Sequence, residues 1–186
     1  MTIAANTTTS KPDRRDYPHR PDEVRRRIQY SITHNTRSLD LRCMGMASLP
    51  EEIFGLVELE EMFLRDNRLS RIPTEIGRLS NLKHLHLHSN VLTHIPDELG
   101  ELHALEILNL PDNMLSGLPE SIGNLRRLQY LDLRSNNIRF LPATFRELDS
   151  LKTLVVEGND ELGIPPELSS HDAKQILGFY FSNKGS

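Results

Sequence analysis

The chain has 186 residues and carries 22 Lys and Arg against 26 Asp and Glu, a formal net charge of −4 at pH 7. With 37% hydrophobic and 26% charged residues, the composition is typical of a folded domain and disfavours a generally basic nucleic-acid-binding or membrane-surface protein. A single cysteine, Cys43, excludes an internal disulfide framework, and no stretch approaches the roughly 20 apolar residues of a membrane span. Because the first residues also lack a signal-peptide pattern, we expect a cytoplasmic protein.

The N-terminal part of the sequence divides into a polar stretch and an amphipathic one. Residues 1–20 offer almost nothing to bury, so we expect a disordered tail there. A helix is predicted over residues 21–35, because Pro21 suits a first helical position. Its apolar stripe consists of Val24, Ile28 and Ile32. This stripe is expected to cover the open end of the structure that follows.

An internal repeat dominates the rest of the chain. Aligning the sequence on leucines that lie 23 residues apart gives six repeats over residues 36–168. The aligned leucines, position one of the second to sixth repeats, are Leu59, Leu82, Leu105, Leu128 and Leu151. Positions four and six of each repeat are apolar, as in a short strand with one buried face. Further apolar positions follow on the return limb, so the repeats must stack to bury both limbs.

Two more repeated positions indicate how each repeat turns. Asparagine occupies position nine in five repeats, at Asn67, Asn90, Asn113, Asn136 and Asn159. An amide there can satisfy the backbone groups that the bend leaves without partners. Proline occupies position fifteen in all six, at Pro50, Pro73, Pro96, Pro119, Pro142 and Pro165. Its fixed φ suits a return limb that needs no ladder donor.

These positions together carry a family resemblance. The consensus LxxLxLxxNxLxxLPxxIxxLxx resembles the leucine-rich repeat of the Ras-suppressor and plant intracellular Ras-group proteins, and the repeat region of Roco GTPases. The resemblance implies an α/β fold, a curved leucine-rich-repeat solenoid with a parallel sheet on its concave face. It also implies protein binding, with a small GTPase or another signalling protein as the partner. The first and last repeats depart from the consensus, with Met44 at the asparagine position and Glu161 at a leucine position, where capping units belong.

A second helix is predicted at the C-terminal end, over residues 169–186. Ser169 and Asp172 resemble a capping box. The apolar residues that follow at helical spacing are Ala173, Ile176, Leu177 and Tyr180. We therefore expect helical caps at both ends of the solenoid.

The strand pattern also predicts a binding surface. If positions four and six point inward, positions three, five and seven face solvent on the concave sheet. The candidate partner-binding residues at these positions are Phe63, Arg65, His84, His86, His88, Ile107, Asn109, Tyr130, Asp132 and Arg134. Exposed aromatic side chains beside arginines are typical of protein interfaces. The sequence thus favours a scaffold or adaptor that binds another protein, with no nucleic acid partner.

Histidines at alternate positions of one strand leave a different possibility open. His84, His86 and His88 lie on one side of the third predicted strand, and histidine pairs of this spacing occur in zinc sites. A surface row of histidines without metal is the simpler interpretation, because the strand spreads the rings apart. Protonation of these rings below pH ~6.5 would make partner binding sensitive to pH.

Three common enzyme motifs do not occur in the sequence. The sequence has no GxxxxGK[ST] phosphate loop, no HExxH and no GxSxG, so we expect neither an enzyme nor a cofactor. The main alternative is that these repeats are the recognition arm of a larger enzyme or a bacterial effector, such as a Roco-type GTPase or a ligase. The histidine strand as a metal site is the third hypothesis.

Overall fold

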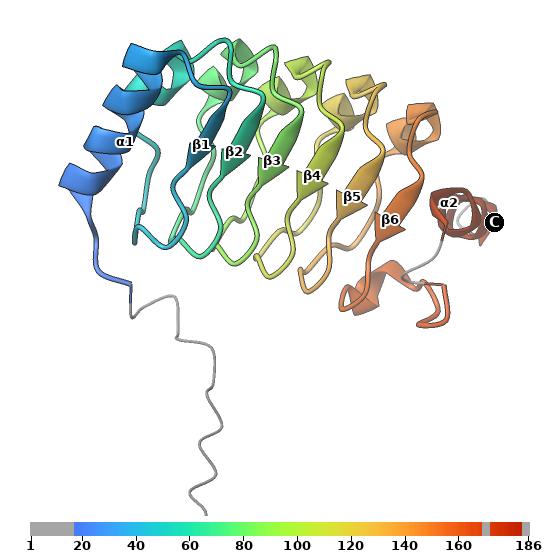
Figure 1. Ribbon diagram of the computed structural model, residues 1–186. Coiled ribbons are helices and arrows are strands. Elements are labelled where there is room, and N and C mark those ends of the chain that lie inside the picture. Colours follow the sequence, from blue (N-terminus) through green and yellow to red (C-terminus); the bar gives the residue numbers. More distant parts are fainter. Residues whose placement is uncertain (1–16, 169–171, 184–186) are drawn as a thin grey trace, which may run out of the picture.

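The computed structural model describes residues 17–168 and 172–183, in which two helices flank a six-stranded sheet (Figure 1). Helix α1 spans Pro21–His34 and helix α2 spans Ala173–Asn183. The strands are β1 (Ser38–Asp40), β2 (Glu61–Phe63), β3 (His84–His86), β4 (Ile107–Asn109), β5 (Tyr130–Asp132) and β6 (Thr153–Val155). Neighbouring strands pair in parallel and in chain order, each residue with its equivalent in the next repeat. The predicted solenoid with helical ends is confirmed.

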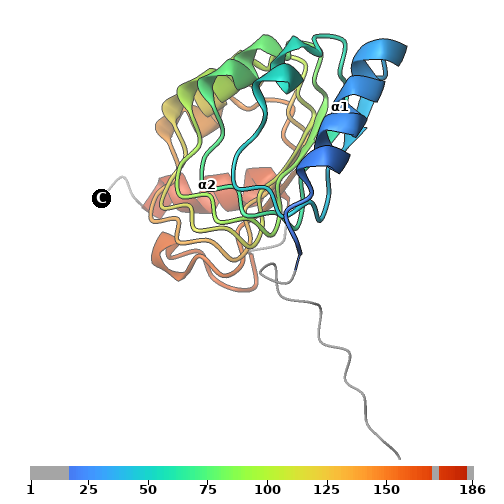
Figure 2. The same cartoon turned by 90° about the vertical axis from the view of Figure 1, so that its left-hand side faces the viewer.

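The return limbs carry short 3-10 helices, which Figure 2 shows stacked behind one another along the solenoid. The stacked turns are η2 (Glu51–Gly55), η3 (Thr74–Arg78), η4 (Asp97–Glu101), η5 (Glu120–Asn124) and η6 (Ala143–Glu147), whereas η7 (Asp160–Leu162) lies earlier in the last repeat and apart from this row. A proline with φ between −53° and −71° precedes each of the first five, and its carbonyl accepts the first hydrogen bond of the turn. The repeated proline therefore starts the turn, as its fixed φ predicts.

Leucines of the strands and of the return limbs form one continuous core. Leu85, Leu87, Leu108 and Leu110 at positions four and six have no exposed surface. The same cluster extends from Val24 on α1 to Tyr180 on α2. Because every repeat shares its core with both neighbours, the stack gains stability that a single repeat lacks.

The asparagines at position nine bind adjacent repeats together. The Asn90 amide nitrogen donates to the carbonyls of Leu64 and Leu87 at 3.0 and 2.9 Å, and its oxygen accepts from the Leu69 backbone N–H at 3.0 Å. Asn67, Asn113, Asn136 and Asn159 repeat this pattern. Each side chain thus satisfies backbone groups of its own repeat and of the preceding one, as the sequence predicted.

Helix α1 covers the first edge of the sheet. Val24 and Ile28 are buried as predicted, and an Arg27 Nη1 donates to the Asp40 carbonyl of β1 at 2.7 Å. The prediction for Ile32 was wrong, since its side chain is 48% exposed. Residues four apart in an α-helix rotate by about 40°, so the third member of the stripe leaves the buried face. Ser31 lies against the core in its place.

Helix α2 covers the other edge. Its Ala173 backbone N–H donates to the Lys152 carbonyl at 3.0 Å, and Asp172 forms an antiparallel bridge with Thr153 of β6. The Asp172 carboxylate accepts a hydrogen bond from the Lys174 backbone N–H at 2.8 Å and so caps the helix. Ser169 of the expected capping box lies outside the described residues. Residues 1–16 of the expected N-terminal tail lie outside them as well. In the last repeat Leu162, beside the exposed Glu161, supplies the buried side chain.

Charged side chains at position two connect the repeats along the edge where the strands begin. Glu60 pairs with Arg37 of the preceding repeat and with Lys83 of the following one, the latter at 2.7 Å. Further along, the Lys152 ammonium donates to Gln129 at 2.9 Å. Opposite charges therefore alternate over the first four repeats, and cross-strand pairs of this kind stabilise a sheet.

Candidate binding face

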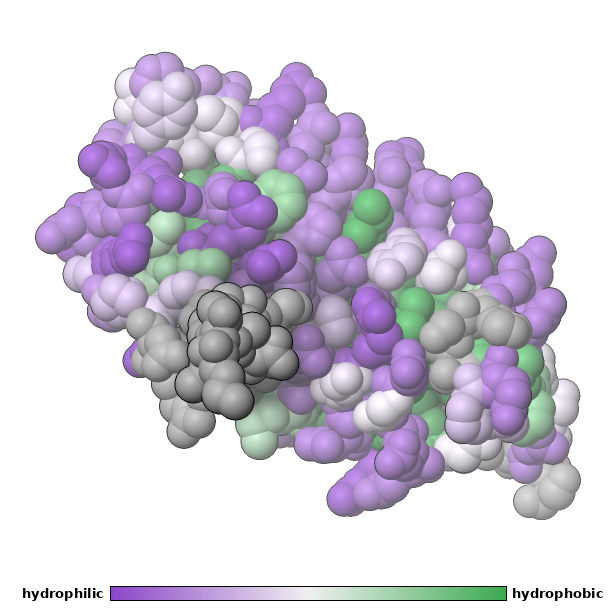
Figure 3. Space-filling view, turned by 60° about the horizontal axis from the view of Figure 1, so that its bottom comes forward, coloured by the Kyte–Doolittle hydropathy of each residue, from purple (hydrophilic) through white to green (hydrophobic). Residues whose placement is uncertain are grey.

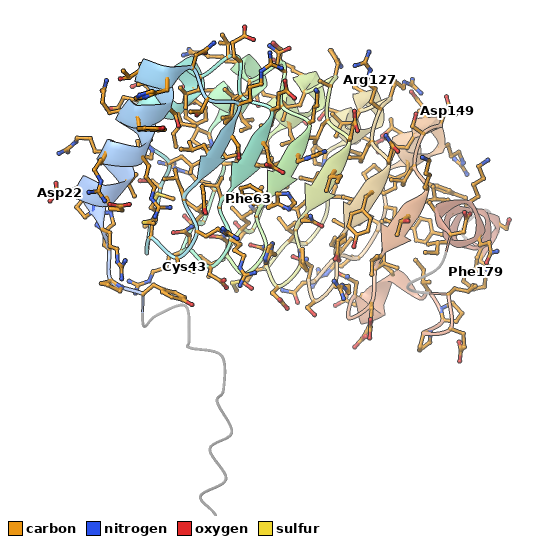
Figure 4. All side chains as sticks on the ribbon, in the orientation of Figure 1. Asp22, Cys43, Phe63, Arg127, Asp149 and Phe179 are labelled. Atoms are coloured by element: carbon orange, nitrogen blue, oxygen red, sulfur yellow. The ribbon has the colours of Figure 1, made fainter. Side chains whose placement is uncertain are left out.

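The side chains at positions three, five and seven lie on the open side of the sheet, which we call the strand face. Figure 4 shows Phe63 projecting from β2 on this side, while its sequence neighbours Met62 and Leu64 are fully buried in the core. Positions three and five are mostly half-buried by their neighbours, and three arginines at position seven are exposed. Of the predicted residues, Asp132 is buried, and the others are exposed or half-buried on this face.

A row of side chains crosses the first four strands in direct contact. The rings of Phe63 and His86 stack with centroids 4.8 Å apart and an interplanar angle of 8°. The guanidinium carbon of Arg42 lies 5.2 Å from the Phe63 centroid on β2. On β4, the Asn109 amide donates to His86 Nδ1 at 2.8 Å. We call Arg42, Phe63, His86 and Asn109 the central row, whose side chains are held in place by one another.

Asp132 departs from the prediction. It lies in the predicted position on β5, but its side chain is only 2% exposed. The Arg134 guanidinium covers it, donating from Nε to both carboxylate oxygens at 3.1 Å and from Nη2 to Oδ2 at 2.7 Å, and the Tyr130 hydroxyl lies 3.4 Å from Oδ2. Tyr130 and Arg134 therefore form the accessible surface at this point, while Asp132 lies beneath them and fixes the guanidinium.

Two more arginines of this face are fixed by nearby carboxylates. Arg42 makes a two-point contact with Asp40 at 2.9 and 2.7 Å, and this contact lowers the pKa of that carboxyl. Arg65 donates to Asp66 at 2.7 Å. Charge-assisted pairs of this kind reduce the rotamer freedom that a long side chain would lose on binding a partner.

The three histidines have different surroundings. His84 Nδ1 lies 3.3 Å from Glu61, and the His84 and His86 rings meet edge to face with centroids 6.5 Å apart. Burial lowers the pKa of His86, and burial together with the nearby Arg65 charge lowers the pKa of His88. Across residues 17–168 and 172–183, no three His, Cys, Asp or Glu side chains lie close enough together to hold a metal ion. The geometry therefore gives no support to the metal hypothesis.

The lowered pKa of His86 predicts a pH-dependent contribution to stability. Among the charged groups near the His86 ring, Glu61 favours its protonated form, whereas His88, His84 and Arg42 disfavour that form. Because the folded state prefers the neutral ring, its stabilisation is present above the unfolded pKa of about 6.5 and is lost as the pH falls through the folded pKa. We expect His86→Gln to lose less unfolding free energy than the wild type between pH 7.5 and pH 5. Chemical denaturation at both pH values measures this.

The matched control for this prediction is the exposed His103. His103→Gln should retain the wild-type pH dependence. Equal pH dependence in the wild type and His86→Gln would show that protonation of His86 does not oppose folding.

A hollow that the sequence did not indicate lies beside the last strands. It has a volume of about 620 Å³ and is lined by Arg127, Asp149, Lys152 and Lys174, among others. Figure 4 places Arg127 and Asp149 at the upper edge of the sheet, away from Phe63. No motif could reveal this hollow, because it forms only where α2 meets the final repeats. Its charges are mixed, and it is separate from the central row.

The side that Figure 3 brings forward, which is the lower side of the molecule in Figure 1, is mostly hydrophilic, with small separate hydrophobic areas. Within the described part of the chain, no helix has both the length and the apolar character needed to cross a bilayer. Neither observation replaces the strand face as the main candidate site.

Comparison with known proteins agrees with this architecture. The family model described as a leucine-rich repeat region matches residues 31–114 and 97–170. No curated protein sequence matches the chain significantly.

Similar solved structures include a leucine-rich repeat protein of Leptospira interrogans, 35% identical with a TM-score of 0.60, over 68% of this chain and 39% of that one. The BIR3–SERK2 complex from Arabidopsis thaliana is 35% identical with a TM-score of 0.53, over 58% of this chain and 61% of that one. The plant peptide hormone receptor RGFR1 in complex with RGF2 is 34% identical with a TM-score of 0.54, over 60% of this chain and 18% of that one. This chain thus spans less than two thirds of each of these proteins. It belongs to the leucine-rich repeat family, whose domains typically bind proteins.

Proposed function

We propose that this protein is a scaffold or adaptor that binds another protein through the strand face. The observation that carries the proposal is the central row, in which Arg42, Phe63, His86 and Asn109 are already ordered by mutual contacts. A surface whose side chains are fixed beforehand loses little conformational entropy on binding, so a modest patch can give useful affinity. Phe63 and Tyr130 supply the aromatic area, and the arginines at position seven border it.

The similar structures support this proposal in two cases. BIR3 and SERK2 were solved as a complex with one another, and RGFR1 was solved with RGF2. A macromolecular partner is therefore the kind of ligand that we assign to the present chain. From the resemblance of its consensus, we propose a small GTPase or another signalling protein in the cytoplasm, and no catalytic activity of its own.

A second proposal is that the chain forms the recognition part of a larger protein, such as an enzyme or an effector. It is favoured by the coverage of the Leptospira protein, of which the chain spans 39%. The length of the native open reading frame distinguishes the two proposals, and both use the strand face in the same way.

The test is affinity capture from the native host with a double variant of the strand face. Phe63→Ala combined with Tyr130→Ala removes two half-buried aromatic rings and should reduce partner capture at least tenfold. The melting temperature should change little, because neither ring lies in the core. Quantitative mass spectrometry of the captured proteins, together with thermal unfolding, measures both effects.

The matched control removes apolar side chains outside the strand face. Met114 and Phe140 are 52% and 54% exposed, and Met114→Ala with Phe140→Ala should leave capture unchanged. If the control variant lost the partner while the Phe63 and Tyr130 variant kept it, the binding site would lie off the strand face.

A further inference from the structure

Position seven of the repeats has an unusual order of charges. At position two, opposite charges alternate across the strands and pair between repeats, as Glu60 does with Arg37 and Lys83. At position seven, the first three repeats instead carry Arg42, Arg65 and His88 in succession. Arg42 and Arg65 thus place like charges on neighbouring repeats, an arrangement that the alternating charges at position two avoid.

The backbone places these three residues side by side. The ladder of hydrogen bonds continues past the strands, from the Cys43 N–H to the Arg65 carbonyl and from the Asp66 N–H to the His88 carbonyl, both at 3.1 Å. Adjacent strands in a sheet lie about 4.8 Å apart, which sets the spacing of the three side chains. The two guanidinium groups and the imidazole therefore form one continuous edge, which we call the cationic edge.

The carboxylates beside Arg42 and Arg65 pair within their own repeat, whereas the carboxylates near His88, those of Asp66, Asp112 and Asp132, come from other repeats. Arg42 pairs with Asp40 and Arg65 with Asp66, at 2.7 Å in both cases. The Asp66 side chain is 19% exposed against 44% for Arg65, so the carboxylate lies beneath its guanidinium. Asp40 also lies 4.0 Å from Arg27, so two guanidinium groups share its charge. Arg65 is therefore clearly more exposed than the carboxylate that it binds, and Arg42 is slightly more exposed than Asp40, at 46% against 39%.

An apolar surface adjoins the cationic edge. Arg42 lies over the Phe63 ring, which stacks on His86, so the edge continues directly into the central row. A ligand that follows the edge across the strands therefore meets positive charge on one side and aromatic surface on the other.

We propose that the cationic edge binds an extended acidic segment of the partner, with an apolar residue of that segment against Phe63. This inference rests on the proposed function of the strand face and specifies the chemistry of its partner. The carboxylates of the segment bind the outward N–H groups of Arg42 and Arg65 and the ring of His88. An extended chain advances about 3.3 Å per residue, so alternate side chains on one face of the segment lie about 6.6 Å apart. The strands lie about 4.8 Å apart, and the length of a glutamate side chain bridges the difference.

The proposal is tested by fluorescence anisotropy with defined peptides. The probe is a fluorescein-labelled nonapeptide with glutamates separated by glycines and one central leucine. The same peptide with glutamine in place of every glutamate is the comparison. The acidic peptide should bind at least tenfold more tightly than the glutamine peptide, and added salt should weaken its binding.

Variants of the chain separate a specific edge from the effect of net charge. Arg42→Gln with Arg65→Gln should weaken binding of the acidic peptide at least tenfold. Arg71→Gln with Arg78→Gln changes the net charge equally at exposed positions outside the strand face and should leave binding unchanged. Asp40→Asn with Asp66→Asn keeps the guanidinium groups, and it should bind as tightly as the wild type or more tightly. Circular dichroism shows that each variant is folded.

Equal binding of the two peptides, or equal loss in both arginine variants, would overturn the inference. The proposed function would survive that outcome if capture of the native partner still depended on Phe63 and Tyr130. Conversely, specific binding of the acidic peptide by a chain whose native capture is insensitive to Phe63 and Tyr130 would support the cationic edge and contradict the wider strand-face proposal.

Discussion

Replacing Asn90 with alanine should destabilise the protein by about 4 kcal/mol, because three buried backbone groups lose their partner at once. The side chain has no exposed surface and bonds the Leu64 and Leu87 carbonyls and the Leu69 N–H. Alanine leaves a space bordered by these groups, and a single water cannot restore the same contacts to both repeats. Chemical denaturation, with the unfolding free energy extrapolated to zero denaturant, measures the loss.

Asn137 is the matched control for this substitution. It lies one position after the equivalent asparagine of the fifth repeat, and its side chain is exposed. Asn137→Ala should change the unfolding free energy by less than about 0.5 kcal/mol. Similar losses for Asn90→Ala and Asn137→Ala would show that the position-nine amides do not connect the repeats.

The second large effect is expected at Gly100, where alanine should cost about 3 kcal/mol. Gly100 lies on η4, where an added Cβ would come within 2.4 Å of the Ser121 carbonyl oxygen on η5. This neighbour is backbone, so the two turns must separate to make room. Gly123 repeats the arrangement, with Thr144 Cβ at 2.5 Å from its added Cβ. Glycine at this position therefore allows the 3-10 turns of neighbouring repeats to pack closely.

Gly55 tests whether the effect is steric. It lies on η2, and nothing approaches within 4 Å of an added Cβ. Gly55→Ala should be neutral or stabilising by about 0.5 kcal/mol, because alanine reduces the freedom of the unfolded chain. Thermal and chemical unfolding of both variants measure the difference. A Gly100→Ala variant as stable as Gly55→Ala would contradict the close packing of η4 against η5.

Most of the fold could be predicted from the 23-residue period of the sequence. Leucines at fixed positions predicted the strands, the sheet and the shared core, because the same burial requirement returns in every repeat. The helix α1 was less well determined. The apolar spacing predicted that Val24, Ile28 and Ile32 are all buried, but Ile32 is exposed. How many turns of the helix contact the first repeat depends on the angle at which the helix packs, which the spacing does not specify.

The candidate face was predictable in outline but not in its internal contacts. Asp40 and Asp132 occupy the same position, yet their side chains are 39% and 2% exposed. The difference arises at position three, where β5 has Tyr130 to cover the carboxylate and β1 has the small Ser38. Such coverage depends on which rotamers neighbouring side chains adopt, and the pattern of repeats contains no information about that.

The identity of the partner cannot be predicted from the repeat consensus. The consensus positions form the core and the turns. The strand face therefore consists of residues that differ from repeat to repeat. Their charges and ring contacts become interpretable only when the sheet register brings Arg42, Phe63 and His86 together.

Photocrosslinking to the captured partner shows which surface of this chain the partner touches. The photoreactive amino acid p-benzoylphenylalanine would replace Tyr130 in one sample and the exposed Phe140 in another. We expect a covalent adduct with the partner from position 130 and none from position 140. An adduct from position 140, with none from position 130, would contradict binding at the strand face.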